Sequence, residues 1–191
     1  MEQQSADQPS DQSLMLAVRE GDVEKLGILF ERYHGQLFNF LLRLTGNRHL
    51  SEDLVQEVFV RLLKYRHTYR GESRFATWMF RIARNARIDY FRRSPQADVS
   101  IEDEVREFVS LAPAPGEQME QEEEMQIMLD ALARLPEDRR EVLLLRGFQG
   151  LRFEEIAKAL NCSVNTVKGR AFRGIRDLRV SMDQLKGERV P

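Results

Sequence analysis

The side chains of this chain best suited to chemistry are arginines and lysines that gather in two segments, residues 61–93 and 164–179. The first segment holds ten basic residues against two acidic ones, and the second holds five against one. Cationic groups at this density attract phosphate backbones, because binding releases the counterions that surround a nucleic acid. Both segments therefore predict contact with nucleic acid. The alternative is a pair of ordinary solvated helix faces.

The total charge of the chain hides these segments. Lys and Arg number 29 while Asp and Glu number 31, for a formal charge of −2, and this total alone would argue against a nucleic-acid partner. The balance comes from residues 98–124, where ten acids stand against one base. An acidic stretch between two basic ones indicates surfaces with separate tasks.

The composition argues against several other classes of function. One cysteine, Cys162, and three scattered histidines offer no zinc-ligand spacing, so we expect no metal. The chain carries no Gly-rich phosphate loop or nucleophile motif, so we expect neither a cofactor nor enzymatic activity. No apolar run approaches the length of a membrane span, and residues 1–13 are polar, which predicts a cytoplasmic protein.

The elements that must position these residues have helical patterns, which predicts an all-α fold. No segment shows sustained alternation of apolar and polar residues, and Leu, Ala, Glu, Arg and Gln supply most positions outside loops. Helices are expected at residues 13–19, 23–44, 51–66 and 76–93 and again beyond residue 120, with Ser51 as an N-cap and Pro136 opening a helix. The pattern divides into two small helical domains, residues 13–94 and 120–185, a flexible acidic linker at 95–119, and tails at 1–12 and 186–191.

The second domain ends in a predicted helix-turn-helix, with helices at 153–160 and 164–179 joined by the turn 161–163 and Ser163 as N-cap. At about 100° per residue, the packed side of the second helix holds Val164, Val167, Ala171, Ile175 and Leu178. The opposite side holds Asn165, Lys168, Gly169, Phe172, Arg173, Arg176 and Arg179. An outward phenylalanine among arginines suits a DNA major groove, and Gly169 would let the backbone approach DNA. Gly174 lies on the packed side, where we expect it to permit a tight helix contact.

The helix at 76–93 carries the basic residues of the first domain on one face. Its predicted core stripe is Phe75, Met79, Ile82, Ala83, Ala86 and Tyr90. The other face carries Thr77, Trp78, Arg81, Arg84, Asn85, Ile88 and Arg92, a mixture of cations with groups able to stack on bases or hydrogen-bond to them, as single-strand binding requires. The loop before the helix, which includes Ser73 and Arg74, could meet a displaced base. For Trp78 we expect partial burial in the core rather than a stacking role, because tryptophans usually pack there.

The preceding helix at 51–66 has a different outer face. Asp53, Gln56, Glu57 and Val60 lie along the side opposite its apolar residues. An exposed valine within a polar stripe is a weak indication of a protein partner, and an ordinary solvated face is the alternative.

Three runs of residues resemble bacterial sigma factors of the extracytoplasmic-function class. They are Asp53-Leu54-Val55-Gln56-Glu57-Val58-Phe59-Val60, the run from Phe75 to Asn85, and Leu135-Pro136-Glu137-Asp138-Arg139-Arg140-Glu141-Val142 followed by the helix-turn-helix. The resemblance spans about residues 13–185. It implies two domains, known in this family as region two and region four, and an alternative sigma factor that binds core RNA polymerase and directs promoter-specific initiation.

The resemblance also implies roles for the three faces. Asp53, Gln56, Glu57 and Val60 would dock on the clamp coiled coil of the largest polymerase subunit. The minus-ten element would be recognised and opened by Ser73, Arg74, Trp78, Arg81, Arg84, Asn85, Ile88 and Arg92, with a flipped base near Asn85. The minus-thirty-five duplex would be read by Asn165, Lys168, Gly169, Arg170, Phe172, Arg173 and Arg176. A cognate anti-sigma factor is a further implied partner.

Lys168-Gly169-Arg170 departs from the residues that many relatives carry at the start of this surface, so no promoter sequence can be transferred to this chain. The competing hypothesis is a helix-turn-helix regulator that acts without being a polymerase subunit. It would leave the faces at Asp53–Val60 and Trp78–Arg93 unexplained.

Overall fold

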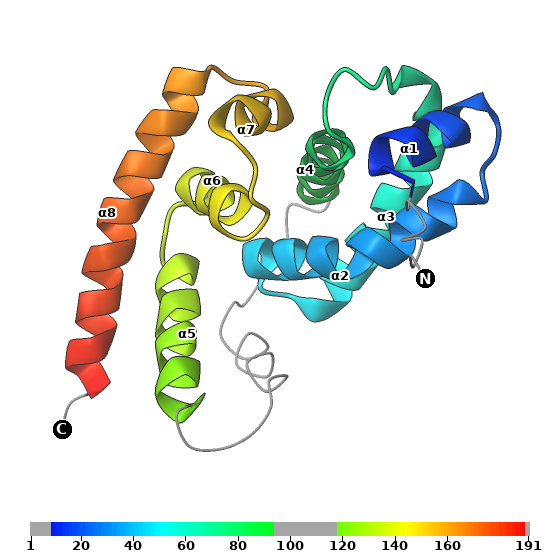
Figure 1. The fold of residues 1–191 in the computed structure, drawn as a ribbon. Helices are drawn as coiled ribbons and strands as arrows, with labels where there is room; N and C mark the ends of the chain where they lie inside the picture. Colours follow the sequence, from blue (N-terminus) through cyan, green and yellow to red (C-terminus); the bar gives the residue numbers. More distant parts are fainter. Residues whose placement is uncertain (1–8, 94–117, 190–191) are drawn as a thin grey trace, which may run out of the picture.

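The computed structural model describes residues 9–93 and 118–189, and every regular element within them is helical (Figure 1). The predicted all-α fold is therefore confirmed. The acidic linker predicted at residues 95–119 lies almost wholly outside the described residues, as does most of the predicted N-terminal tail. No helix among those described is both long enough and apolar enough to cross a membrane.

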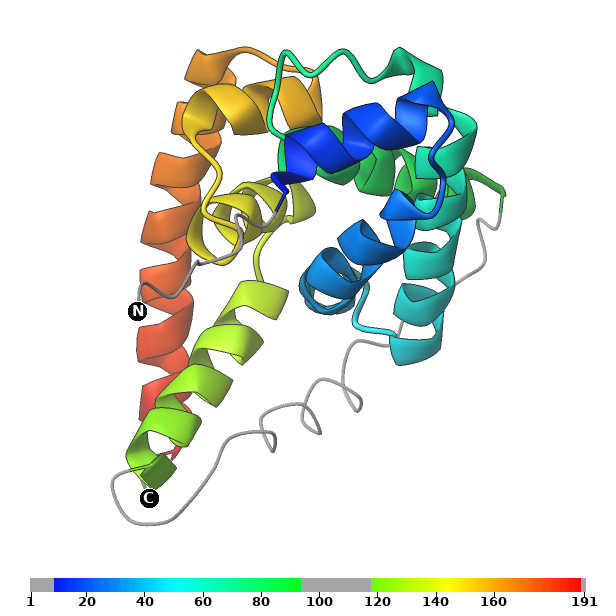
Figure 2. The ribbon, with the colours of Figure 1, turned by 45° about the vertical axis from the view of Figure 1, so that its right-hand side comes forward.

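The first domain consists of α1 (Asp11–Glu20), α2 (Lys25–Thr45), α3 (Arg48–Lys64) and α4 (Phe75–Arg93), with a short 3-10 turn at Arg66–Thr68. Apolar side chains at helical spacing meet in its centre, where Phe40 of α2 and Phe80 of α4 are almost completely buried in edge-to-face contact. This core holds α3 and α4 together and fixes which of their faces turn outward (Figure 2).

The N-cap predicted for α3 was wrong. The helix begins at Arg48, and the side chain of Asn47 caps it by accepting a hydrogen bond from the Leu50 N–H at 2.8 Å. Ser51 is completely buried inside the helix, where its hydroxyl donates to the carbonyl oxygen of Asn47 at 2.6 Å. The glycine at position 46, in the left-handed conformation that ends α2, places Asn47 at the start of the new helix.

The second domain consists of α5 (Gln118–Ala133), α6 (Glu137–Gly147), α7 (Phe153–Leu160) and α8 (Val164–Arg189). Helix α8 continues ten residues beyond the predicted end at Arg179 and into the predicted tail, as far as Arg189. Its C-terminal half packs along α5, where Leu185 is buried against Ile127 and Ala131 and Lys186 forms an ion pair with Glu124 at 3.3 Å. This antiparallel contact explains the extra length (Figure 1).

The two domains contact each other. Helix α4 packs against α7, and α2 packs against α6 and the end of α5. Arg140 of α6 is 8% exposed and donates to the carbonyl oxygens of Ala133 and Leu135 at 2.8 and 2.9 Å, and to that of Leu44 in α2 at 3.5 Å. Buried apolar side chains of both domains form one continuous cluster. Because α4 packs against α7, the contact with the second domain lies on the side of the first domain that bears the basic face of α4.

Candidate nucleic-acid interfaces

The turn between α7 and α8 has the geometry of a helix-turn-helix. Asn161 ends α7 in the left-handed conformation, with φ of 52°, a conformation that asparagine tolerates. The Thr166 N–H donates to Ser163 Oγ at 3.0 Å, so the predicted N-cap of α8 is confirmed. Cys162 is a half-buried free thiol in the same turn. The turn sets the first half of α8 against α6 and α7, with its opposite face turned to solvent.

The outward face of α8 presents most of the residues predicted to read duplex DNA. Phe172 is 73% exposed, and the other exposed members are Asn165, Lys168, Arg173 and Arg176. A phenylalanine ring this exposed in the free protein indicates a binding surface, because a ligand that covers the ring would remove its apolar area from water. Arg170 differs, because its guanidinium forms an ion pair with Asp138 of α6 at 3.1 Å and its side chain is 26% exposed.

The packed side of α8 was predicted with one error. Ile175 was placed there but is 53% exposed. The buried stripe runs instead through Val167, Ala171 and Gly174 and continues to Ser181 and Leu185. A Cβ atom at Gly174 would lie 3.2 Å from the side chain of Leu143, so α6 crosses α8 most closely at this glycine, and Ile175 is turned about 100° away.

Gly169 has a different environment from Gly174. A Cβ atom there would meet only the guanidinium of Arg173, at 3.5 Å. Packing within the protein gives no reason for glycine, whereas alanine would favour the helix by roughly 1 kcal/mol. The close approach of an external ligand to the backbone, as predicted, would account for it.

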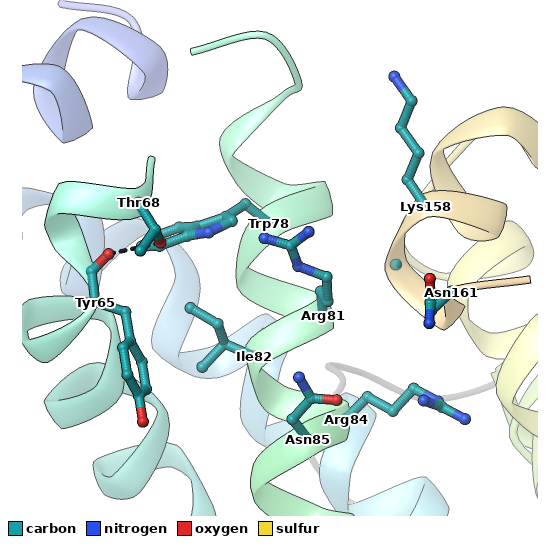
Figure 3. Close-up of a pocket in the computed structure, with 10 residues that line it drawn as sticks. Tyr65, Thr68, Trp78, Arg81, Ile82, Arg84, Asn85, Lys158 and Asn161 are labelled. Carbon is teal, nitrogen blue, oxygen red and sulfur yellow. Dashed lines mark hydrogen bonds between the residues drawn. The ribbon is translucent and has the colours of Figure 1, made fainter. Parts of the chain in front are cut away.

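The basic face of α4 borders a pocket of about 480 Å³. Figure 3 shows Arg81, Arg84 and Asn85 of α4 on one side of the pocket and Lys158 and Asn161 of the second domain on the other. Arg81 and Asn85 are exposed, and Arg84 is half-buried. Several residues predicted to bind single-stranded DNA thus line one wall of the pocket. The segment Phe153–Asn161 of the second domain lies on the opposite side.

Three residues of α4 do not lie where the helical projection put them. Thr77, predicted on the outer face, is only 3% exposed. Trp78 is only 4% exposed, with its ring centroid 5.1 Å from that of Tyr69 and 6.4 Å from that of Phe75. Its predicted place on the outer face is wrong, because α4 is surrounded by protein over more than half its circumference at that end. Tyr90, predicted in the core stripe, is 37% exposed, since the helix has passed beyond the domain core there.

The remaining residues assigned to the minus-ten element lie on the same side of the first domain. Arg74 and Arg92 are exposed and Ser73 is half-buried. Arg92 forms an ion pair with Asp89 at 3.0 Å, and Ile88 is 40% exposed. Each of these side chains is therefore accessible at least in part.

Three arginines of the first domain form ion pairs with glutamates of the second. Arg74 lies 3.7 Å from Glu155 and Arg84 lies 3.5 Å from Glu141, and Arg87 donates to Glu137. The hydrogen bond from Arg87 lowers the pKa of Glu137 below its ordinary value, whereas burial raises the pKa of Glu141.

Arg87 was not among the predicted functional residues, although it is 3% exposed and central to this contact. Its position on the packed side of a predicted helix was a signal, because a buried cation requires an acid. No feature of the sequence pointed to Glu137, fifty residues away, as that acid.

The outer face of α3 lies on another side of the first domain. Asp53 and Gln56 are exposed, and Val60 is 60% exposed. Glu57 accepts from Arg61 at 2.6 Å, and Arg61 also binds Asp89 of α4 at 2.8 Å, which lowers the pKa of Asp89. This network fixes Glu57 beside an exposed apolar residue, as a protein-binding surface would require.

Two helical domains, one ending in a helix-turn-helix and the other carrying a basic helix, define a DNA-binding transcription factor of the sigma type. Residues 29–95 match Sigma-70 region 2, and residues 125–178 match Sigma-70, region 4. The chain is 34% identical to the ECF RNA polymerase sigma-E factor of Haemophilus influenzae over 176 residues, which cover 88% of this chain and 93% of the relative. It is 35% identical to the ECF RNA polymerase sigma factor SigX of Bacillus subtilis over 172 residues, covering 86% and 87% of the two chains.

The chain belongs to the extracytoplasmic-function sigma factors, and it is an alternative sigma factor that directs transcription. Solved structures share its fold. CnrH, solved in complex with the cytosolic domain of CnrY, superposes with a TM-score of 0.69 at 22% identity, covering 92% of this chain and 99% of that one. RpoE of Bartonella quintana, solved with the anti-sigma factor NepR, gives 0.63 at 24% identity, covering 82% and 96%. The first domain is called region 2 below, and the second region 4.

Proposed function

We propose that this chain binds core RNA polymerase through the outer face of α3, reads the minus-thirty-five duplex with α8, and opens and holds the minus-ten element with α4. The observation that carries the proposal is that three exposed faces lie on three different helices, α3, α4 and α8. An exposed apolar and acidic face lies on α3, and two cationic faces lie on different domains of a chain that belongs to the sigma factors. A regulator that acts without polymerase would need neither the α3 face nor the α4 face.

The two cationic faces suit different forms of DNA. Helix α8 follows a helix-turn-helix turn and presents Lys168, Phe172 and Arg173 outward, as a helix in a major groove does. Helix α4 combines Arg81 and Arg84 with the amide of Asn85, which can hydrogen-bond to an unpaired base. Capture of unpaired bases would offset the few kcal/mol that unpairing costs.

The face of Asp53, Gln56, Glu57 and Val60 would dock on the clamp coiled coil of the largest polymerase subunit. We also infer an anti-sigma partner for this chain, because RpoE of Bartonella quintana was solved with the anti-sigma factor NepR. Such a partner would have to compete with polymerase or with DNA for the same faces.

Replacing Gln56 and Glu57 together with alanine is expected to weaken binding of core polymerase by at least about 1 kcal/mol, because both side chains lie beside exposed Val60 at the centre of the proposed contact. The measurement is the affinity of fluorescently labelled full-length protein for core polymerase. Glu52→Ala, in the same helix but paired with Arg48 at 3.1 Å, is the matched control and should leave the affinity unchanged. Undiminished affinity of the double variant, with helicity preserved, would reject this docking face.

A further inference from the structure

The contact between the two domains borders the face of α4 that the proposed function assigns to promoter DNA, and it engages two residues of that surface while others stay exposed. Glu155, Glu141 and Glu137 of region 4 bind Arg74, Arg84 and Arg87 of region 2. Two of these arginines, Arg74 and Arg84, belong to the predicted minus-ten surface. A carboxylate on an arginine takes the position that a backbone phosphate would take.

We propose that the acidic surface of region 4 formed by Glu137, Glu141 and Glu155 is a binding site for the chain's own α4, so that the free protein closes on itself and excludes single-stranded DNA from region 2. The inference rests on the proposed function only for the identity of what is excluded. The closed contact itself is a property of the free chain.

Contacts beside the ion pairs extend the closed interface along α2. The guanidinium of Arg43 lies over the ring of Phe148 at 4.3 Å, and Arg140 reaches the carbonyl oxygen of Leu44. Burial of Arg43 and Arg140 lowers the pKa of each guanidinium, although both remain charged. Closure therefore engages two helices of region 2, and it orients region 4 so that α7 faces α4.

The interface is imperfectly satisfied, which suits a contact that must open. Among the described residues, buried side-chain atoms without a hydrogen-bond partner include four on the facing elements α4 and α6. They are Thr77 Oγ1, Arg87 Nε, Arg140 Nε and Glu141 Oε1. Buried polar atoms left unpaired oppose closure, because water would satisfy them in the open chain.

Repulsion between like charges across the interface also opposes closure. The pocket between the domains is lined by Arg81 and Arg84 of α4 and by Lys158 of α7 (Figure 3). Cations that share one pocket repel each other, and only the neighbouring glutamates offset this. An entering DNA strand would bring phosphate to the α4 arginines as soon as region 4 moved away.

The decisive variant replaces Glu137, Glu141 and Glu155 with glutamine in the full chain. Glutamine keeps the side-chain oxygen with which Glu155 accepts from the Arg152 N–H at 2.7 Å, so the start of α7 should remain capped. Two quantities are measured without polymerase: the radius of gyration by small-angle X-ray scattering, and the affinity for a fluorescein-labelled single-stranded DNA of 20 nucleotides and mixed sequence.

We expect the triple variant to be more expanded than the unaltered chain and to bind the oligonucleotide about tenfold more tightly. The apparent affinity of a partly closed protein is reduced by the fraction that is open, so a tenfold gain corresponds to an open fraction of about one tenth. Arg87→Gln breaks the same contact from region 2 and should expand the chain as well. It serves as the second variant if the triple variant does not fold by circular dichroism.

The matched control removes three negative charges from exposed positions of α5 and α8, through Glu123→Gln, Asp183→Asn and Glu188→Gln. It should stay compact and gain no more than the small affinity expected from its altered net charge. A triple variant that is as compact as the unaltered chain, with the same oligonucleotide affinity as the control, would overturn the proposal. Expansion without a gain in affinity would also overturn it, because DNA would not be what closure excludes, while the polymerase-binding experiment would still test the proposed function independently.

Discussion

Replacing both Lys168 and Arg173 with alanine is expected to lower the affinity of the sigma–polymerase complex for its promoters by roughly 2–6 kcal/mol, if each side chain reads a base. Both side chains are exposed on the outward face of α8 on either side of Phe172. Neither supports the core of region 4, whose contact with α8 runs through Val167, Ala171 and Gly174. The fold should therefore survive the change.

The measurement compares promoter duplex with random-sequence duplex of the same length at one salt concentration, because the phosphate contribution to affinity depends strongly on salt. Lys186→Ala with Arg134→Ala removes the same charge at the far end of the α5 and α8 pair, and it should change promoter affinity little. An equal loss on both duplexes in the Lys168 and Arg173 variant would make these residues phosphate contacts and would remove their role in sequence recognition.

Trp78→Ala is expected to destabilise region 2 by about 3–5 kcal/mol, the usual cost of removing a large buried aromatic side chain. Trp78 is 4% exposed and packs against Tyr69 and Phe75. The neighbouring Arg81→Ala removes an exposed side chain of the same helix and should alter stability by no more than about 0.5 kcal/mol.

Urea unfolding of the full chain, followed by far-ultraviolet circular dichroism, measures this difference. Trp78 is the only tryptophan, so the emission of the unaltered protein reports on it alone and should have the short wavelength of a buried indole. If Trp78→Ala unfolds at the same urea concentration as the unaltered chain, the indole is not part of the core, and a role in stacking on bases would gain support.

The helix positions and the helix-turn-helix could be predicted because their signals are local. Ser163 lies immediately before an apolar helical stripe, and the turn that it ends is only three residues long. The exposed positions of α3 could also be predicted. Leu54, Val58 and Leu62 place the core on one side of the helix, so the residues on the opposite side must be exposed.

The errors arose where tertiary contacts override a projection. Ile175 points outward because α6 packs against α8 at Gly174. Trp78 is buried because Tyr69, which precedes α4 in the chain, packs against the indole ring. Neither contact is encoded at helical spacing. The extension of α8 depends on α5, which is distant in sequence.

The contact between the domains could not have been predicted from this sequence alone. Arg87 and Glu137 are separated by fifty residues, and each would be satisfied equally well by other partners if the domains were apart. Charge counts did indicate that α4 attracts an anion. They could not show that the chain itself supplies carboxylates to that face.

We propose that a polymerase brings this chain to promoters, where the chain selects the start of transcription. Run-off transcription with purified core polymerase, fragments of the genomic DNA and the full-length protein tests it most directly. We expect transcripts of discrete length that begin at defined positions, and none when the protein is omitted. Failure to initiate at any defined position, together with no association between the protein and core polymerase, would contradict the claim.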